Sequence, residues 1–86
     1  MDVLRVAAGS NARSLAGCIA GVIREQGRVE VQAVGAAAVN QTIKAVAIAR
    51  EFLVLDGIDI VLIPAFTQVV IDEHEKSAIR FVVERR

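Results

Sequence analysis

The spacing of hydrophobic positions changes along the chain, and its first half predicts a strand, a helix and a second strand. Residues 3–8 form a short, mostly apolar run before the turn-forming residues 9–11, which is typical of a strand that ends in a turn. In residues 13–26, apolar side chains recur three or four positions apart and Gly27 follows, which predicts an amphipathic helix. Residues 29–34 alternate between apolar and polar side chains, as a half-buried strand does.

The second half predicts a longer helix and another strand. Residues 37–55 are rich in alanine and have one apolar stripe, and the pair Asp56-Gly57 follows, which indicates a helix and its end. Residues 58–63 form a nearly continuous apolar run, which is typical of a strand covered on most of its surface. We expect Pro64 to bend or end the first part of this strand.

The last part of the chain predicts a hairpin. Residues 67–71 continue extended, residues 72–76 are a polar turn, and residues 77–84 alternate again. The turn contains His74 among acidic neighbours, and we expect this histidine to be exposed. The tip is net acidic, so it would repel the phosphates of a nucleic-acid duplex.

The predicted order is β-α-β-α-β-β, which defines an α/β domain, in finer terms an α+β two-layer sandwich, over residues 1–86. Right-handed crossovers place both helices on one face of a mixed four-stranded sheet. The other face has no helical cover. If it holds much of the valine and isoleucine surplus, it exposes an apolar patch of the kind that marks an interface. We therefore expect self-association, as a homodimer or a tetramer.

Composition restricts both the core and the class of function. Hydrophobic residues make up 55% of the 86 residues, but only three are aromatic, so aliphatic side chains must build most of the core. We expect Phe52, Phe66 and Phe81, which have aliphatic neighbours, to lie mainly in this core. The formal net charge of zero excludes a protein that coats DNA through a global positive field, and any nucleic-acid binding requires a local patch.

The single cysteine and single histidine exclude a disulfide framework and a zinc site built from several such residues. We expect Cys18 to be a buried, unreactive thiol, because its neighbours are small and apolar. No apolar run reaches the roughly 18 residues of a membrane span. A reduced, cytoplasmic location without membrane attachment is the resulting expectation.

Polar residues are expected to gather where the two helices begin. The carboxyl ends of adjacent parallel strands meet at one edge of a sheet, and the N–H groups of helix N-termini favour anions there. The candidate nucleic-acid-binding residues are Ser10, Asn11, Arg13, Asn40, Gln41 and Lys44. Two alternatives remain open: Ser10 or Asn11 caps the first helix, and Asn40 and Lys44 form a solvated helix face.

Other charged residues offer weaker candidates. Arg50 lies too far along the second helix to join the same phosphate contact, and we expect it to form a surface ion pair. Arg5 and Arg80 are expected to point outward from the sheet into solvent. The carboxylates provide no desolvated acid and base pair, and the Gly35 segment lacks the second glycine and the Lys-Ser/Thr of a P-loop. We therefore expect no enzyme activity, no metal and no cofactor.

Several segments together resemble the stage V sporulation protein S family over almost the whole chain. These segments are GAAAVNQTIKAVAIAR (35–50), IPAFT (63–67), ID (71–72), SLAG (14–17) and IAGV (19–22). More distantly, the element order and the small-residue opening of the second helix are similar to the Alba superfamily of small dimeric DNA- and RNA-binding proteins. The resemblance implies an Alba-like fold, a bacterial cytoplasmic protein, a regulatory role in sporulation or development, and nucleic-acid binding.

Residues and resemblance together favour a DNA- or RNA-binding regulatory protein that contacts the phosphate backbone as a homo-oligomer. The alternative is a non-enzymatic protein-interaction module in sporulation or developmental regulation that does not bind nucleic acid. A third hypothesis is a sensor of a small anion or metabolite at the same helix N-termini. The first loop has one basic residue, Arg13, where relatives usually have lysines, which reduces the number of expected phosphate contacts.

Overall fold

A computed structural model describes residues 3–86 and has the predicted order of elements. The elements are β1 (Val3–Val6), α1 (Ala12–Gln26), β2 (Arg28–Ala33), α2 (Ala36–Val54), β3 (Ile60–Ile71) and β4 (His74–Arg85). The β-α-β-α-β-β order predicted from hydrophobic spacing is therefore confirmed, and the two helices begin and end within one residue of their predicted limits.

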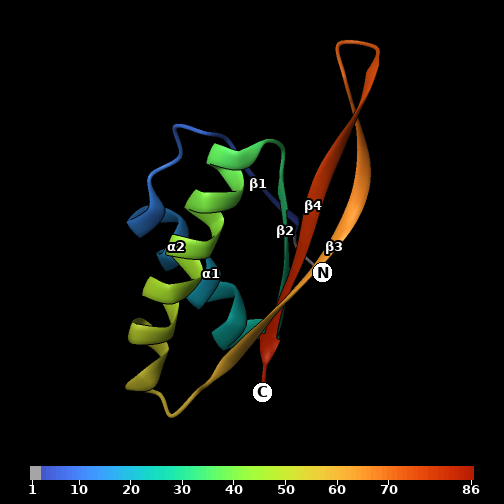
Figure 1. The fold of residues 1–86 in the computed structure, drawn as a ribbon. Coiled ribbons are helices and arrows are strands. Elements are labelled where there is room, and N and C mark those ends of the chain that lie inside the picture. The colour runs from blue at the N-terminus through green and yellow to red at the C-terminus, as the bar shows by residue number, and fades with distance from the viewer. Residues whose placement is uncertain (1–2) are drawn as a thin grey trace.

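The four strands form one mixed sheet in the order β1-β2-β4-β3. β1 and β2 are parallel, whereas β4 runs antiparallel to both β2 and β3. Both helices cover the same face of the sheet (Figure 1), as right-handed crossovers require. The predicted two-layer architecture is confirmed, and β1 and β3 are the two edge strands.

Local sequence fixes both ends of α1. Asn11 is the N-cap, and Gly27 ends the helix in the left-handed conformation at φ 77°, where its N–H donates to the carbonyl oxygen of Ile23 at 2.8 Å. A residue with a Cβ is strained at such a φ, so glycine suits this position. β2 begins at the next residue, Arg28, so this cap sets the sharp return of the chain onto the sheet.

The core lies between the helices and alternate residues of the strands. Val29, Val31 and Val83 are fully buried beneath the helices, and Phe81 is 3% exposed. The buried polar side chain Thr42 donates from Oγ1 to the carbonyl oxygen of Ala38 at 2.9 Å, so its hydroxyl is satisfied within α2. The predicted burial of Phe81 is thus confirmed, and aliphatic residues supply the rest of this layer.

The sheet face opposite the helices is charged over its centre. Glu30 and Gln32 of β2 lie there, and Arg80 of β4 places Nε 3.9 Å from Glu30. Apolar side chains on this face, such as Ile63, lie mainly toward the β3 edge. Most of the large exposed apolar residues therefore lie elsewhere on the protein. The open face of the sheet does not form the large apolar patch that an excess of valine and isoleucine there would have produced.

β3 and β4 form a longer hairpin than the sequence suggests. β3 continues through Pro64 without a break, because an edge strand tolerates a residue that has no N–H to donate. The turn consists of Asp72 and Glu73 alone, at φ 51° and 65°, and β4 already starts at His74. The strand end that was the alternative expected at Pro64 is therefore not found, and the prediction of a five-residue turn was wrong. The paired strands extend beyond the helical layer (Figure 1), and the molecule is 43 Å long.

Two other burial predictions were wrong. Phe66 is 86% exposed, because it lies on the edge strand β3, and the α2 residues with which it lines a small cavity leave most of its ring uncovered. Cys18 is exposed, since the buried side of α1 is formed by other residues, including Ile19 and Ala20. Small apolar neighbours in the sequence do not determine which side of a helix a residue occupies.

The buried leucine near the end of α2 provides a test of the core. Leu53 is 0% exposed, whereas Leu55, two residues later, is 90% exposed. Leu53→Ala should lower the free energy of unfolding by about 2–5 kcal/mol, because it removes buried methyl groups and leaves a cavity. Leu55→Ala should change it by no more than about 0.5 kcal/mol. Urea unfolding followed by circular dichroism measures both, and equal losses would contradict this packing.

Candidate nucleic-acid interface

The loop after β1 and the start of α2 meet at one edge of the sheet. β1 and β2 are parallel, so their carboxyl ends lie together. Gln41 of α2 donates from Nε2 to the carbonyl oxygen of Ser10 at 2.6 Å, which links the helix to the loop. Of the six candidate residues, the structure therefore brings Ser10, Asn11 and Gln41 together.

The polar side chains of the loop hold the backbone. Asn11 Oδ1 accepts from the N–H of Ser14 at 2.9 Å, which makes Asn11 the N-cap of α1. Ser10 Oγ accepts from the N–H of Ala7 at 3.0 Å and closes the turn after β1. The capping alternative is confirmed for Asn11. One of the N–H groups at the start of α1 that has no partner within the helix is therefore bound by a side chain of the protein itself.

The start of α2 is open. Its N-cap is Gly35, at φ 90°, and no side chain caps the helix. Ala36 and Ala37 are exposed, and the first turn contains no acidic residue. The unpaired N–H groups and the helix dipole therefore favour an anion at this end.

Two further candidates lie on the outer side of α2. Asn40 and Lys44 are both exposed and are four residues apart, so they share a helix face. In residues 3–86, Lys44 forms no ion pair with another side chain. In the free protein, Asn40 and Lys44 thus form a solvated helix face, as one of the two alternatives predicted. In this position the ammonium group of Lys44 is available to a phosphate.

Arg13 does not join this group. Its guanidinium carbon lies 5.8 Å from the centroid of the Phe52 ring, within the range of a cation–π contact. Phe52 is in the last turn of α2, whereas the open N–H groups are in the first turn. The predicted grouping of Arg13 with Asn40, Gln41 and Lys44 is therefore not found, because the contact between the two helices directs the arginine elsewhere.

A cleft at the same end of the sheet was not predicted from the sequence. Its volume is about 910 Å³, and residues of β1 and the loop after it line one side, including Arg5. Gln32 of β2 and residues 68–71 of β3 also line it. β1 and β3 are opposite edges of the sheet, and the twist of the long hairpin brings residues of both to one cleft. Alternation along β1 was the one available signal, since it predicted an outward-facing Arg5, and Arg5 is exposed in the structure.

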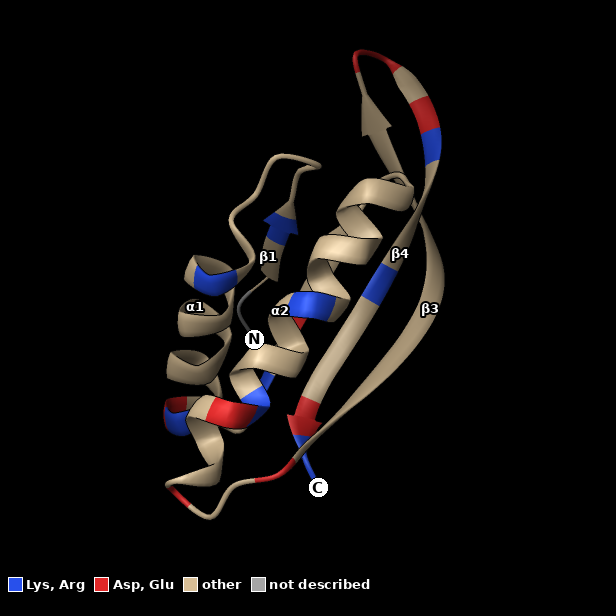
Figure 2. Ribbon diagram, turned by 60° about the vertical axis from the view of Figure 1, so that its left-hand side comes forward, with Lys and Arg blue, Asp and Glu red and all other residues tan. Residues whose placement is uncertain are grey.

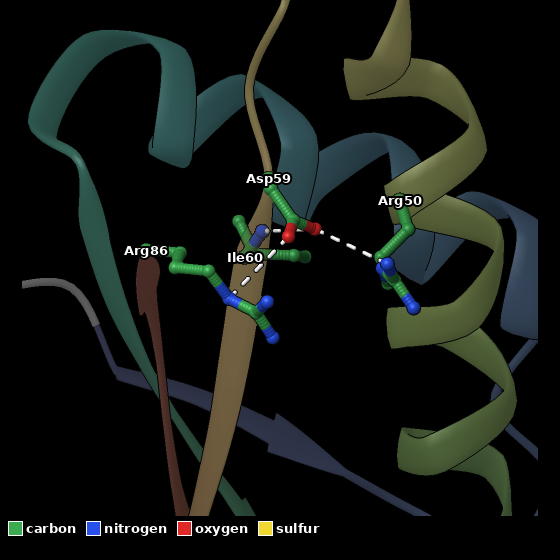
Figure 3. Close-up of polar contacts among 4 residues, drawn as sticks. All are labelled: Arg50, Asp59, Ile60 and Arg86. Atoms are coloured by element: carbon green, nitrogen blue, oxygen red, sulfur yellow. Dashed lines mark hydrogen bonds and ion pairs between the residues drawn. The ribbon is translucent and has the colours of Figure 1, made fainter.

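Most other arginines are neutralised within the protein. Arg50 Nη2 lies 3.2 Å from Asp59 Oδ1, and Arg86 Nε lies 3.4 Å from the other carboxylate oxygen (Figure 3). The N–H of Ile60 also donates to Asp59 Oδ1. The surface ion pair predicted for Arg50 is confirmed, and this cluster joins α2 to the start of β3 and to the chain end.

Charge is unevenly distributed along the hairpin. Its tip is acidic (Figure 2), with Asp72 and Glu73 in the turn and Glu75 beside them. His74 is exposed, as predicted, and in residues 3–86 no three His, Cys, Asp or Glu side chains are grouped closely enough to hold a metal ion. The tip is therefore the part of this end least suited to a phosphate backbone.

The fold and this end of the sheet define a small two-layer α+β protein with an open, uncapped helix start beside a cleft. The sequence model of the stage V sporulation protein S family matches residues 2–86. The chain therefore belongs to the stage V sporulation protein S family, as the resemblance indicated. This membership supports a role related to sporulation. None of the described helices is both long and apolar enough to cross a membrane.

The capping role of Asn11 can be tested by substitution. Asn11→Ala should lower the free energy of unfolding by about 1 kcal/mol, because the N–H of Ser14 loses its side-chain acceptor. Asn11→Ser should retain most of the stability, since serine also caps helices well. Asn40→Ala, at an exposed helix position, is the matched control. Denaturant unfolding should separate the first variant from the other two.

Proposed function

We propose that this protein is a non-enzymatic regulatory protein that binds the phosphate backbone of DNA or RNA as a homo-oligomer. The observation that supports this most directly is the uncapped first turn of α2. Its N–H groups would donate to a phosphate, and Asn40 and Lys44 lie farther along the same helix. Association of copies would multiply the few contacts that each chain offers.

Backbone contact is favoured over recognition of bases. Phe81 is buried, and Phe52 lies against the Arg13 guanidinium. Stacking of successive bases requires exposed aromatic rings, and Phe66 is the one highly exposed ring of the described chain. The proposed binding should therefore depend on salt and depend little on nucleotide sequence.

A titration of labelled duplex DNA, single-stranded DNA and RNA by fluorescence anisotropy tests the proposal. The protein should be treated with nuclease, purified again and measured at two salt concentrations. Binding in the micromolar range or tighter at low salt, weakening as salt rises, is the expected result. No binding of any of the three at low salt would contradict the proposal.

A carboxylate placed in the open turn tests the site itself. Ala37→Glu should weaken binding about ten-fold at low salt, because the new carboxylate repels a phosphate and occupies the N–H groups. The same change should leave α2 as stable or slightly more stable. Leu55→Glu adds the same charge at the opposite end of α2 and should leave the affinity nearly unchanged. Equal effects of both variants would show that only net charge matters.

Lys44 tests the cationic part of the site. Lys44→Gln should weaken binding to all sequences alike and reduce the slope of log affinity against log salt by about one. Arg85→Gln removes the same charge from the end of β4, far from the start of α2, and should have little effect. An unchanged salt slope in the Lys44 variant would place the phosphate contacts elsewhere.

A protein-interaction module is the second candidate function. The exposed Phe66 ring on β3 favours it, because it borders a small cavity of about 190 Å³ that Val39 and Ile79 also line. Exposed aromatic groups beside pockets are common in protein interfaces. If the folded protein bound none of the three nucleic acids in the titration, protein interaction would become the leading candidate function.

A further inference from the structure

The large cleft at the end of the sheet contains one charged side chain, and this side chain is unpaired. Among residues 3–86, Arg5 is the one charged residue that lines the cleft of about 910 Å³. It is exposed and forms no ion pair within the described chain. Arg80 lies in the same row across the sheet, but Glu30 is beside it. The cleft therefore carries a positive charge that the described chain does not neutralise.

The rest of the cleft is uncharged and mainly apolar. Gln32 and Gln68 contribute side-chain amides, and valine, alanine and isoleucine residues at 6–8, 34 and 69–71 form the remaining lining. The volume lies within the range of ligand-binding pockets, roughly 300–1,000 Å³. A ligand that combines apolar groups with a single negative charge matches this lining.

β3 has unpaired backbone groups along its outer edge. β3 is bonded to β4 alone, and the two-residue turn sets Ile71 opposite His74. In such a hairpin, the residues that flank the turn exchange both hydrogen bonds, and bonded and non-bonded pairs then alternate. The N–H and C=O groups of Gln68 and Val70 therefore point away from β4. Pro64 occupies a position of the same alternation, as suits a residue without an N–H.

The twist of the hairpin brings this edge to the cleft. β3 and β4 cross each other along the hairpin (Figure 2), and residues 68–71 of β3 line the cleft together with β1, whereas no residue of β4 does. These four residues span about 13 Å. An extended peptide of similar length could hydrogen-bond to the free backbone groups of Gln68 and Val70, as strands that add to a sheet edge do.

The acidic hairpin tip distinguishes between possible ligands. Asp72 and Glu73 follow directly after Ile71, which lines the cleft. A nucleic acid carries a negative charge at every nucleotide, so the tip would repel it. A peptide can instead place one carboxylate against Arg5 and apolar residues along β3. The guanidinium group suits this role, because it can donate two parallel hydrogen bonds to a carboxylate.

We propose that the cleft binds an extended peptide segment of another protein. The segment adds as a strand to residues 68–70 of β3 and places an Asp or Glu side chain against Arg5. This site is separate from the phosphate site and from the cavity beside Phe66, because neither the first turn of α2 nor Phe66 lines it. The inference goes beyond the proposed function, since it requires no nucleic acid and uses none of the residues assigned to phosphate contact.

Selection from a phage-displayed library of random heptapeptides on the nucleic-acid-free protein tests this site. The enriched sequences should share one Asp or Glu among residues that favour strands, such as Val, Ile and Thr. One enriched peptide, synthesised with a fluorescent label, is then titrated by anisotropy. A version with the amide in place of its carboxylate should bind about ten-fold more weakly, because a hydrogen-bonded charge pair is lost.

Substitution of Arg5 tests whether the carboxylate binds there. Arg5→Gln should weaken binding of the acidic peptide about ten-fold and should bind the acidic and amide peptides equally, within about two-fold. Arg85→Gln removes the same charge from the end of β4, outside the cleft, and should leave both affinities unchanged. Equal effects of the two variants would overturn the proposal. If Arg5→Gln weakened binding of nucleic acid and not of the peptide, the cleft would be a phosphate site instead.

Proline substitutions test the addition of a strand to β3. Val70→Pro removes an N–H that points into the cleft and should weaken peptide binding about ten-fold. Phe66→Pro is the matched control, since it removes an N–H of the same alternation at a residue that does not line the cleft. Circular dichroism verifies that both variants are folded. No enriched peptide, enriched peptides without an acidic residue, or equal effects of the two proline variants would overturn the proposal.

Discussion

The antiparallel pairing of β2 with β4 is the constraint on which the rest of the structure depends. Val29 lies opposite Val83 and Val31 opposite Phe81, and these four side chains form the floor on which both helices pack. Because side chains alternate across a strand, a shift of one residue in this register would turn the apolar set away from the helices. The insertion of β4 beside β2 also makes β3 an edge strand, so its outer part has no helical cover.

The ten basic and ten acidic side chains of the sequence balance, and many of the basic ones are also paired within the protein. Five of the ten basic side chains of the sequence form ion pairs within the described chain. Arg24, for example, is paired with Asp56, and Arg28 with Glu84. What is left for an anionic partner is local: a helix dipole, backbone N–H groups and a few isolated cations such as Lys44. Recognition by such a surface depends more on preorganised backbone geometry than on a long-range field.

Hydrophobic spacing was sufficient to predict the elements, their order and the side of the sheet that the helices cover, because these features follow from local periodicity and from crossover handedness. It failed for Phe66 and Cys18, where the apolar character of a residue does not reveal whether another layer lies above it. It also failed for the grouping of Arg13, because its contact with Phe52 depends on how two helices pack. The cleft between opposite sheet edges likewise arises from the coiling of the hairpin, which no short segment of sequence specifies.

The position of Pro64 has a consequence for the behaviour of this protein at high concentration. An exposed edge strand of 12 residues is a template on which further strands can add, and continued addition leads to insoluble aggregates and amyloid-like fibrils. Pro64 removes one hydrogen-bond donor within β3, so a ladder growing along this edge is interrupted before it spans the strand. The same residue that the edge tolerates therefore makes this Val- and Ile-rich strand a poorer template for the addition of further strands.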